Sequence, residues 1–515
     1  MELKDHADDM EARREKIRAE MGGSSRIARI HNEGKLTIRE RIDGMLDEGS
    51  FVEIGTFAQS EMRADRGKTP GDGKISGMGK VDGRPVVIGG DDITVKQGSS
   101  SHIGGKRMKK LEEYAIKHGH PIIYYGETGG ARLPDLLEPD EFAKVQPGVV
   151  MGRRNRKIPA ATVISGLSFG GSSFQSAYSD FVVQVKGTCL AVTSPRVVEV
   201  ATGEQIDFEA LGGWEVHDKH TGMIDRVAED ETDGFQLVRD YLSFLPQNAW
   251  EEPPRRDWDG DLGRDEHMYK LVPTRRQRGY DMRKVIKRLT DDKSIFELKP
   301  NYGGSLVTCF GRIAGRSVGF IASNPMVGAG AITPAACDKA TLFICMCDAF
   351  NLPIIFLQDT PGFMVGRQVE HDRLLSRAIM MVEAMVQSRV PRVTVILRKA
   401  FGLAYAALSG NDMGGDAVLA WPNAEYSFMD PEVGVNVTHA RNLAEAADPD
   451  AERAKLIEEW RQDTSPYPAA GTMAFDEIID PAETRAWLRQ YVDRLHIDVP
   501  RWGEVKPLAS WPTCL

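Results

Sequence analysis

One stretch of this chain is present twice. Residues 79–180 carry a pattern of glycines, prolines and apolar residues that returns 232 positions later without a gap. The matched positions include Gly79 and Gly311, Arg84 and Arg316, Pro121 and Pro353, Thr162 and Thr394, and Phe169-Gly170 and Phe401-Gly402. Because solenoid repeats have much shorter periods, an offset of this length indicates a duplicated domain. We therefore expect two copies of one folding unit.

The length of the chain agrees with two domains. At 515 residues it is too long for one ordinary core and long enough for two of about 230–250 residues. The segment 250–266 is rich in proline and in charges of both signs and has no apolar periodicity, so we interpret it as the linker. The predicted domains are residues 1–255 and residues 256–515.

Composition excludes several classes of protein. A hydrophobic content of 41% and a charged content of 27% are typical of soluble globular proteins, and a net charge of −10 argues against nucleic acid as the main partner. No apolar run reaches the roughly 20 residues that span a bilayer, and the amino terminus has no apolar signal core, so we predict a cytoplasmic protein. The six cysteines lack zinc or disulfide spacing and are expected to be small buried residues.

Both copies are expected to contain the same elements in the same order. A hairpin comes first, then a helix, a strand with an unbroken apolar run, a longer helix after Thr-Gly-Gly or Thr-Pro-Gly, and a final buried strand. The predicted ranges are hairpins at 79–90 and 311–323, helices at 106–117, 338–350 and 374–386, and strands at 120–127, 161–166, 352–359 and 393–398. Strands joined by helical crossovers define an α/β fold. Residues 1–20 are expected to form a solvated helix.

A glycine-rich turn follows the last strand of each copy. It spans residues 165–173 in the first copy, with residues 174–185 compatible with a helix, and residues 398–406 in the second. Glycines let the backbone approach a ligand, and the first N–H groups of a helix have no internal acceptor. Such donors would stabilise a thioester enolate. The alternative is that these glycines only permit tight packing.

Other catalytic patterns are absent from the sequence. There is no phosphate-binding loop, no dinucleotide fingerprint and no metal-spaced set of histidines or cysteines, so no metal is predicted. Glu127 and Asp359 end buried strands and are candidates for general bases, although such single carboxylates more often cap helices. His217 and His220 are interpreted as surface or turn-stabilising residues.

Several motifs together carry a resemblance to a known family. They are GETGGARLPD at 126–135, SG…FGG…S…D at 165–180, LGG…H…G…D at 211–225, QDTPGFMVG at 358–366, RKAFG at 398–402 and DEIIDPAETR at 476–485. In this order they resemble the carboxyltransferase (beta) subunit of biotin-dependent acyl-CoA carboxylases of the propionyl-, methylcrotonyl- and geranyl-CoA type. The resemblance covers nearly all of the chain after residue 30 and implies a tandem of two crotonase-like ββα spiral domains of the ClpP/crotonase type.

The resemblance also implies roles for particular residues. Gly170 and Gly171 would supply N–H groups to the acyl-CoA thioester oxygen, and Gly402, Leu403 and Ala404 would do so on the biotin side. The acyl-CoA side thus falls in the first domain and the biotin side in the second. In the family, carbon dioxide is released from carboxybiotin in a dry pocket and the ureido nitrogen removes the α-proton, so that no side-chain base is needed. The remaining substrate-binding positions are Gly129, Gly130, Phe363 and Ala406.

Two features concern the substrate and the partners. Ala406 matches a position that helps to select the acyl group, and its small side chain hints at room for a bulky or branched chain. The sequence has no Met-Lys-Met biotinylation site and no ATP-binding domain. A partner chain with biotin carboxylase and biotin carboxyl carrier domains is therefore implied, with coenzyme A as part of the substrate and a hexamer whose sites are shared between subunits.

Three other functions are compatible with parts of the pattern. A biotin-dependent acyl-CoA decarboxylase would share every motif and differ only in its partners. A crotonase-like enoyl-CoA hydratase or isomerase needs one domain and a side-chain acid or base, which leaves the second copy unexplained. A non-catalytic CoA-binding scaffold would tolerate loss of the N–H groups in the glycine turns.

Overall fold

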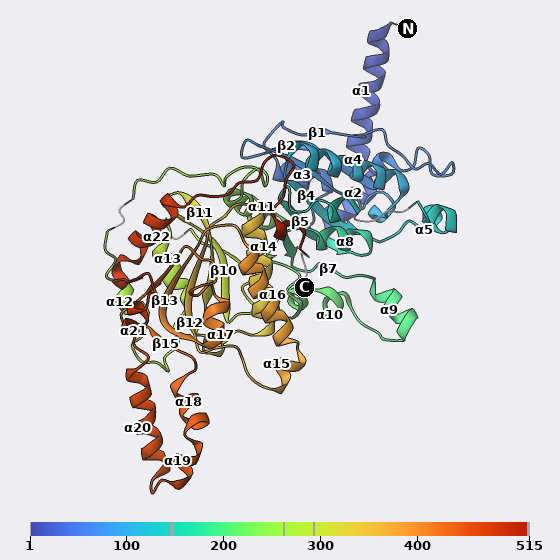
Figure 1. Cartoon of the computed structure of the whole chain (residues 1–515). Helices are drawn as coiled ribbons and strands as arrows, with labels where there is room; N and C mark the ends of the chain where they lie inside the picture. Colours follow the sequence, from blue (N-terminus) through green and yellow to red (C-terminus); the bar gives the residue numbers. More distant parts are fainter. Residues whose placement is uncertain (1, 145–148, 261–262, 292–293, 512–515) are drawn as a thin grey trace. The chain divides into compact units, whose positions relative to one another are not determined.

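The computed structural model describes residues 2–144, 149–260, 263–291 and 294–511. The chain forms two compact units, one reaching to Glu251 and one from Glu252 to Ala509, while Ser510 and Trp511 belong to the first. Within the described residues each unit is built on one eight-stranded sheet (Figure 1).

The first sheet has the order β1-β2-β3-β4-β5-β6-β8, with β7 paired to β5. Its strands are β1 Val52–Glu53, β2 Lys74–Val81, β3 Arg84–Asp91, β4 Ile122–Thr128, β5 Ala160–Ser168, β6 Phe181–Val185, β7 Cys189–Leu190 and β8 Arg226–Ala228. β1, β2 and β3 pair antiparallel, whereas β3 through β8 pair parallel. Parallel neighbours place their carboxyl ends at one edge of the sheet, where ligands of α/β folds are usually bound.

The second sheet repeats this arrangement. Its order is β16-β14-β13-β12-β11-β10-β9, with β15 paired to β13. The strands are β9 Phe296–Leu298, β10 Leu306–Ile313, β11 Arg316–Ser323, β12 Ile354–Thr360, β13 Arg392–Phe401, β14 Ala417–Ala420, β15 Glu425–Ser427 and β16 Glu477–Ile478. The duplication inferred from the sequence is thus present in the strand topology.

The strand register shows where the two copies diverge. Ile122 pairs with Ala160, and Ile354 pairs with Arg392, so the offset of 232 holds through the first strands. Further along, Ala161 pairs with Phe181 but Val393 pairs with Ala417, which is four residues more than the offset allows. The prediction of a gapless repeat to residue 180 is therefore wrong at its end, because the second copy has four extra residues before β14.

The hairpin at the start of each copy is confirmed. Its turn lies at Asp82-Gly83 in the first copy and at Ala314-Gly315 in the second, and all four residues have positive φ, from 49° to 78°. A turn with two such residues matches the twist of the flanking strands, and glycine adopts this conformation without strain. In each unit one aspartate that precedes the copy accepts hydrogen bonds from both N–H groups of the turn: Asp47 in the first, at 3.0 and 2.8 Å, and Asp291 in the second, at 3.0 and 2.7 Å.

The helix after each hairpin is confirmed, with longer bounds than predicted. α4 spans His102–His118 and α14 spans Pro334–Ala349. Ser101 and Thr333 begin them by accepting hydrogen bonds from the N–H groups of Gly104 and Ala336, as N-cap residues do.

The helix α16, Leu374–Gln387, is also confirmed, but two other helical predictions are wrong. The helix expected over 174–185 ends at Ala177, because residues 181–185 form the buried strand β6 and its Val182-Val183 pair favours a strand. Between Gly130 and β5, the described residues form only the one-turn helices α5, α6 and α7 in place of the longer helix expected there.

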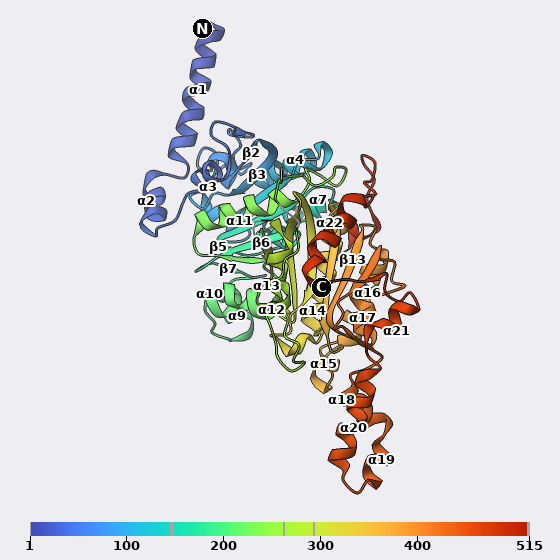
Figure 2. The same cartoon turned by 90° about the vertical axis from the view of Figure 1, so that its left-hand side faces the viewer.

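The remaining helices divide between the two units. In the first unit they are α1 Leu3–Glu20, α2 Ser24–Asn32, α3 Ile38–Met45, α5 Leu133–Leu136, α6 Pro139–Phe142, α7 Val149–Gly152, α8 Gly171–Ala177, α9 Pro195–Thr202, α10 Phe208–Gly212 and α11 Glu231–Phe244. α1 projects from the first unit (Figures 1 and 2) and buries none of its residues, which confirms the solvated helix. Along the described chain, no helix combines the length and apolar character needed to cross a bilayer.

Three helices of the second unit, α18, α19 and α20, form an arm. The remaining helices of this unit, with those of the arm, are α12 Met268–Leu271, α13 Met282–Leu289, α15 Arg367–His371, α17 Gly402–Ala407, α18 Pro431–Thr438, α19 Ala440–Glu445, α20 Pro449–Gln462, α21 Pro466–Gly471 and α22 Thr484–Arg494. α18, α19 and α20 project from the rest of their unit (Figures 1 and 2). The arm is held together by the Trp460 ring of α20, which lies where a Cβ on Gly434 of α18 would come within 2.4 Å of it.

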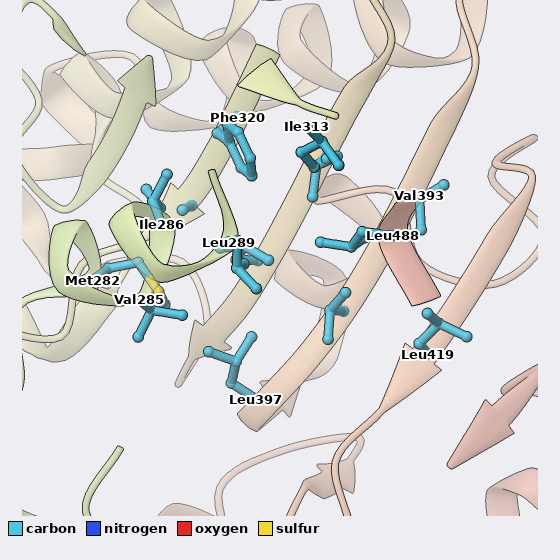
Figure 3. Close-up of a cluster of buried hydrophobic side chains, with 14 of the residues drawn as sticks. Met282, Val285, Ile286, Leu289, Ile313, Phe320, Val393, Leu397, Leu419 and Leu488 are labelled. Atoms are coloured by element: carbon cyan, nitrogen blue, oxygen red, sulfur yellow. The ribbon is translucent and has the colours of Figure 1, made fainter. Parts of the chain in front are cut away.

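A large apolar cluster lies on the second sheet. Figure 3 shows the side chains of α13 (Met282, Val285, Ile286 and Leu289) facing strand residues and Leu488 of α22. Burying one such side chain contributes about 1.5–3 kcal/mol, so clusters of this kind fix the sheet from which the site loops extend. The five cysteines that the structure describes are all buried, as predicted, and Cys514 lies outside the described residues.

Candidate active site

The first glycine turn lies where β5 passes into α8. Gly170 has φ +58° and ψ −125°, a conformation available to glycine at little cost, and a Cβ built on it would meet nothing within 4 Å. Its N–H group donates to the Val192 carbonyl at 3.1 Å. Among the described residues, no acceptor is found for the N–H group of Gly171. Gly170 thus shapes the turn, and Gly171 offers a free donor.

The second glycine turn lies where β13 passes into α17. Gly402 has φ +60°, and a Cβ on it would come within 3.0 Å of the Phe428 carbonyl. Phe428 follows β15, which pairs with β13, and Val192 follows β7, which pairs with β5, so a carbonyl from the equivalent strand end lies near each turn. The side chain of Leu403 is 78% exposed, whereas Ala404 is buried. The two turns therefore share a backbone path and differ in the side chain that each presents.

A second loop reaches the edge of the first sheet beside its turn. Gly129 and Gly130 follow β4, and the Gly130 carbonyl accepts a hydrogen bond from the Ser100 N–H at 2.8 Å. The Ser100 hydroxyl lies 3.7 Å from the position that a Cβ on Gly171 would take. The structure thus brings Gly129, Gly130 and Gly171 to one edge through Ser100.

The corresponding loop of the second copy contains Phe363. Phe363 forms an isolated bridge with Ile332, and the Ile332 N–H donates to the Gly362 carbonyl at 3.0 Å. Phe363 and Ala406 are both half-buried. Phe363 lies after β12 and Ala406 in α17, which follows the neighbouring strand β13.

The two candidate carboxylate bases are held in buried ion pairs. Glu127 accepts from Arg41 at 2.5 Å, and Arg41 also donates to Glu231 at 2.6 Å. Asp359, at the equivalent position, accepts from Arg398 at 3.0 Å. Burial raises the pKa of both carboxyls, and the guanidinium beside each opposes that shift. The expectation that they cap helices is wrong, because both join elements inside their units.

The histidines are confirmed as structural. His217 is buried, and its two ring nitrogens lie 2.9 Å from the Thr221 hydroxyl and 2.7 Å from the Leu190 carbonyl. Burial lowers its pKa. Its ring therefore stabilises the turn around residues 216–221, and His220 is exposed.

One group of potential metal ligands is present in the described chain. Oxygen and nitrogen atoms of Glu61, His102 and Glu141 lie within 4.8 Å of one another. The Nε2 atom of His102 already lies 3.1 Å from both the Asp135 carbonyl and a Glu141 oxygen. His102 and Glu141 are thus engaged with each other.

Comparison with known proteins identifies the family. The model of the carboxyl transferase domain matches residues 29–496. The methylmalonyl-CoA carboxyltransferase 12S subunit of Propionibacterium freudenreichii subsp. shermanii is 36% identical, over 90% of this chain and 89% of its own length. The carboxyltransferase subunit of Haloferax mediterranei propionyl-CoA carboxylase is 35% identical, over 94% and 95%. The solved structure of transcarboxylase 12S with methylmalonyl-coenzyme A and methylmalonic acid bound has a TM-score of 0.90 and 34% identity, covering 98% of this chain and 99% of that one.

The chain belongs to the carboxyl transferase domain family and is an enzyme. Its predicted kinship with the carboxyltransferase subunits of biotin-dependent acyl-CoA carboxylases is confirmed, as is the tandem of two crotonase-like units.

Proposed function

We propose that this carboxyltransferase moves a carboxyl group from carboxybiotin to the enolate of an acyl-CoA, with one glycine turn for each ligand. The observation that carries the proposal is the pair of equivalent turns, each with a glycine at positive φ, at Gly170 and at Gly402. The reaction has two oxygens to bind, one on the thioester and one on the ureido ring. Two turns of one backbone design with different side chains suit two such acceptors.

The first turn is assigned to the acyl-CoA. Gly171 and the following Ser172 present the first N–H groups of α8, which have no acceptor within the helix. Donors fixed before the reaction stabilise an enolate oxygen because they need no reorganisation as charge develops, and each contributes about 3–4 kcal/mol. The Gly170 N–H already donates to the Val192 carbonyl. We therefore assign the N–H groups of Gly171 and Ser172 as the principal donors, in place of the pair Gly170 and Gly171 that the resemblance implies.

The second turn is assigned to the biotin side, where Leu403 and Ala404 would present N–H groups to the ureido oxygen. A ureido oxygen only accepts hydrogen bonds, so backbone donors fit it. When bound, carboxybiotin supplies the carboxyl group and a ureido nitrogen that can accept the α-proton. The residues agree with this division, because Glu127 and Asp359 are held by arginines and neither is free to act as the base.

The proposal includes partners. Biotin would be brought by a separate chain with biotin carboxylase and carrier domains, and the enzyme would work in the cytoplasm. The exposed apolar side chains of Leu375, Ile379 and Val386 on α16 support assembly of several copies, for which we propose a hexamer with sites shared between the domains 1–255 and 256–515 of different subunits.

Reconstitution tests this function. The chain, purified with its co-eluting biotinylated partner, is expected to carboxylate one or more acyl-CoAs from a panel when ATP and bicarbonate are supplied. No transfer to any acyl-CoA would refute the proposal. Release of carbon dioxide from a carboxylated CoA, in association with a membrane pump, would indicate the decarboxylase instead.

The acyl group is expected to be bulky or branched. Ala406 lies in α17, two residues after Ala404, and its side chain is a single methyl group. Ala406→Ile is expected to lower kcat/KM for long or branched acyl-CoAs more than for propionyl-CoA. Equal effects on short and long substrates would refute the assignment of Ala406 to the acyl pocket.

A further inference from the structure

A chain of buried polar groups lies beneath the first glycine turn. Its members come from β2, β3, β4, β5 and α8, and all are buried. They are Lys74, Asp91, Tyr124, Ser168 and Ser172. Lys74, Asp91 and Tyr124 lie outside the motifs that carry the family resemblance, whereas Ser168 and Ser172 lie within the segment 165–180. The proposed reaction uses the backbone N–H of Ser172 and none of the five side chains.

The hydrogen bonds of this chain have one direction. The Tyr124 hydroxyl donates to Asp91 at 2.7 Å and lies 3.2 Å from the Ser172 hydroxyl. Because Tyr124 has a single hydroxyl proton and the carboxylate takes it, Ser172 donates its own proton to Tyr124. Ser168 in turn donates to Ser172 at 3.0 Å. Burial, with the Asp91 carboxylate, raises the pKa of Tyr124 well above 10, so the hydroxyl keeps its proton.

The series of buried polar groups ends at the Lys74–Asp91 ion pair, and Lys74 also holds a second loop of the site. Lys74 Nζ bonds to Asp91 and donates to the Gly98 carbonyl at 3.3 Å. The same carbonyl accepts from the Thr128 hydroxyl at 2.9 Å, at the end of β4. One network therefore connects the loop at Gly98, the strand end before Gly129, and the first turn of α8.

The second copy folds without this series of buried polar groups. At the positions 232 residues later it has only apolar or small side chains: Leu306, Ser323, Phe356, Ala400 and Ala404. The bond between the strand end and its loop is nevertheless kept, since Thr360 donates to the Gly330 carbonyl at 2.8 Å. Burying a polar chain costs free energy, and the duplicated fold does not require one.

A reason for the chain lies in the turn above it. The first copy has two successive glycines, Gly170 and Gly171, whereas the second has Gly402 followed by Leu403. Two glycines leave the backbone conformationally permissive, and catalytic donors misplaced by about 1 Å can lose a hundredfold in rate. Ser172 is the first residue after the glycines that is tied by its side chain.

We infer that Tyr124 and Ser172 are positioning residues of the first turn: anchored on the Lys74–Asp91 pair, they fix the direction of the Gly171 and Ser172 N–H groups toward the thioester oxygen. This inference rests on the proposed function, which assigns that turn to the acyl-CoA.

The test compares two neighbouring tyrosines. Tyr124→Phe removes the hydroxyl from the chain, and Tyr125→Phe removes an equally buried hydroxyl that donates to the Arg41 carbonyl at 3.2 Å. In the assembled complex, Tyr124→Phe is expected to lower kcat/KM for the acyl-CoA roughly tenfold or more and to leave KM for the biotinylated carrier unchanged. Tyr125→Phe is expected to alter neither. Ser172→Ala should match Tyr124→Phe, and the double variant should lose no more than either single variant.

Amide hydrogen exchange gives a readout that does not depend on activity. Faster exchange in residues 168–177 is expected in Tyr124→Phe and not in Tyr125→Phe. Equal exchange and equal kinetics in the two variants would overturn the inference. If the wild-type complex transfers no carboxyl group to any acyl-CoA, the proposed function fails, and the exchange comparison alone decides whether Tyr124 holds the turn.

Discussion

Replacing Gly171 by proline removes one N–H group from the first turn with little other change. Gly171 is the first residue of α8, the helical position that proline tolerates best. A Cβ on Gly171 would meet only the Ser100 hydroxyl, at the ordinary contact distance of 3.7 Å. Gly170 is unsuitable for the same experiment, because its φ of +58° is inaccessible to proline.

The expected effect is large and confined to catalysis. Loss of one N–H donor to a developing oxyanion costs about 3–4 kcal/mol, so kcat should fall about a hundredfold to a thousandfold. Gly171→Ala keeps the N–H group and adds one methyl group, and is expected to stay close to the wild-type rate. The difference between the two variants therefore measures the N–H group itself.

The assay is carboxylation of the acyl-CoA by the complex with its biotinylated partner, with kcat and KM measured separately. Thermal unfolding of both variants shows whether either is destabilised. Equal rates for Gly171→Pro and Gly171→Ala, with equal unfolding temperatures, would refute the assignment of the enolate to this turn. Such a result would favour a scaffold in which the glycines serve only packing.

Three other changes have expected outcomes. Leu403→Pro, compared with Leu403→Ala, should raise KM for the biotinylated carrier or lower kcat, with acyl-CoA affinity unchanged in direct binding. Burial raises the pKa of the Glu112 carboxyl from 4.5 to about 7. The free energy of unfolding of the wild type should therefore fall, by about 3 kcal/mol at most, as the pH rises from 4.5 to about 7. Urea unfolding of Glu112→Gln should lack this pH dependence. Gly434→Ala should loosen the arm, seen as faster proteolysis of α18–α20, because its Cβ would meet the Trp460 ring at 2.4 Å; Gly471→Ala, with open space around it, is the control.

The sequence predicts the fold well because the repeat is made of residues with strong backbone preferences. Gly83 and Gly315 stand at turns with φ +78°, and their spacing marks both hairpins. The buried strands β4 and β12 are equally visible as unbroken apolar runs. Such signals are local, so they can be recognised in the sequence without knowledge of the tertiary structure.

The errors occur where tertiary contacts override local preference. Residues 174–185 can be helical in isolation, but β6 pairs with both β5 and β8 and its side chains are buried. The same applies to Glu127 and Asp359, whose arginine partners Arg41 and Arg398 lie 86 and 39 positions away in sequence. A carboxylate at a strand end looks the same in sequence whether it faces a ligand or an ion-pair partner.

The site shows a further limit of reading one copy at a time. The bond from Gly170 to the Val192 carbonyl and the contact between Tyr124 and Ser172 join residues 22 and 48 positions apart, and neither has a local signal. Comparing the two copies does give such a signal, because Phe356 and Ala404 occupy the positions that correspond to Tyr124 and Ser172. Polar residues shared by both copies serve the common fold, whereas buried polar residues present in one copy need a reason of their own. In this chain that difference lies directly under the turn that carries two glycines, which is why the asymmetry of the duplication is best explained by the reaction and not by the fold.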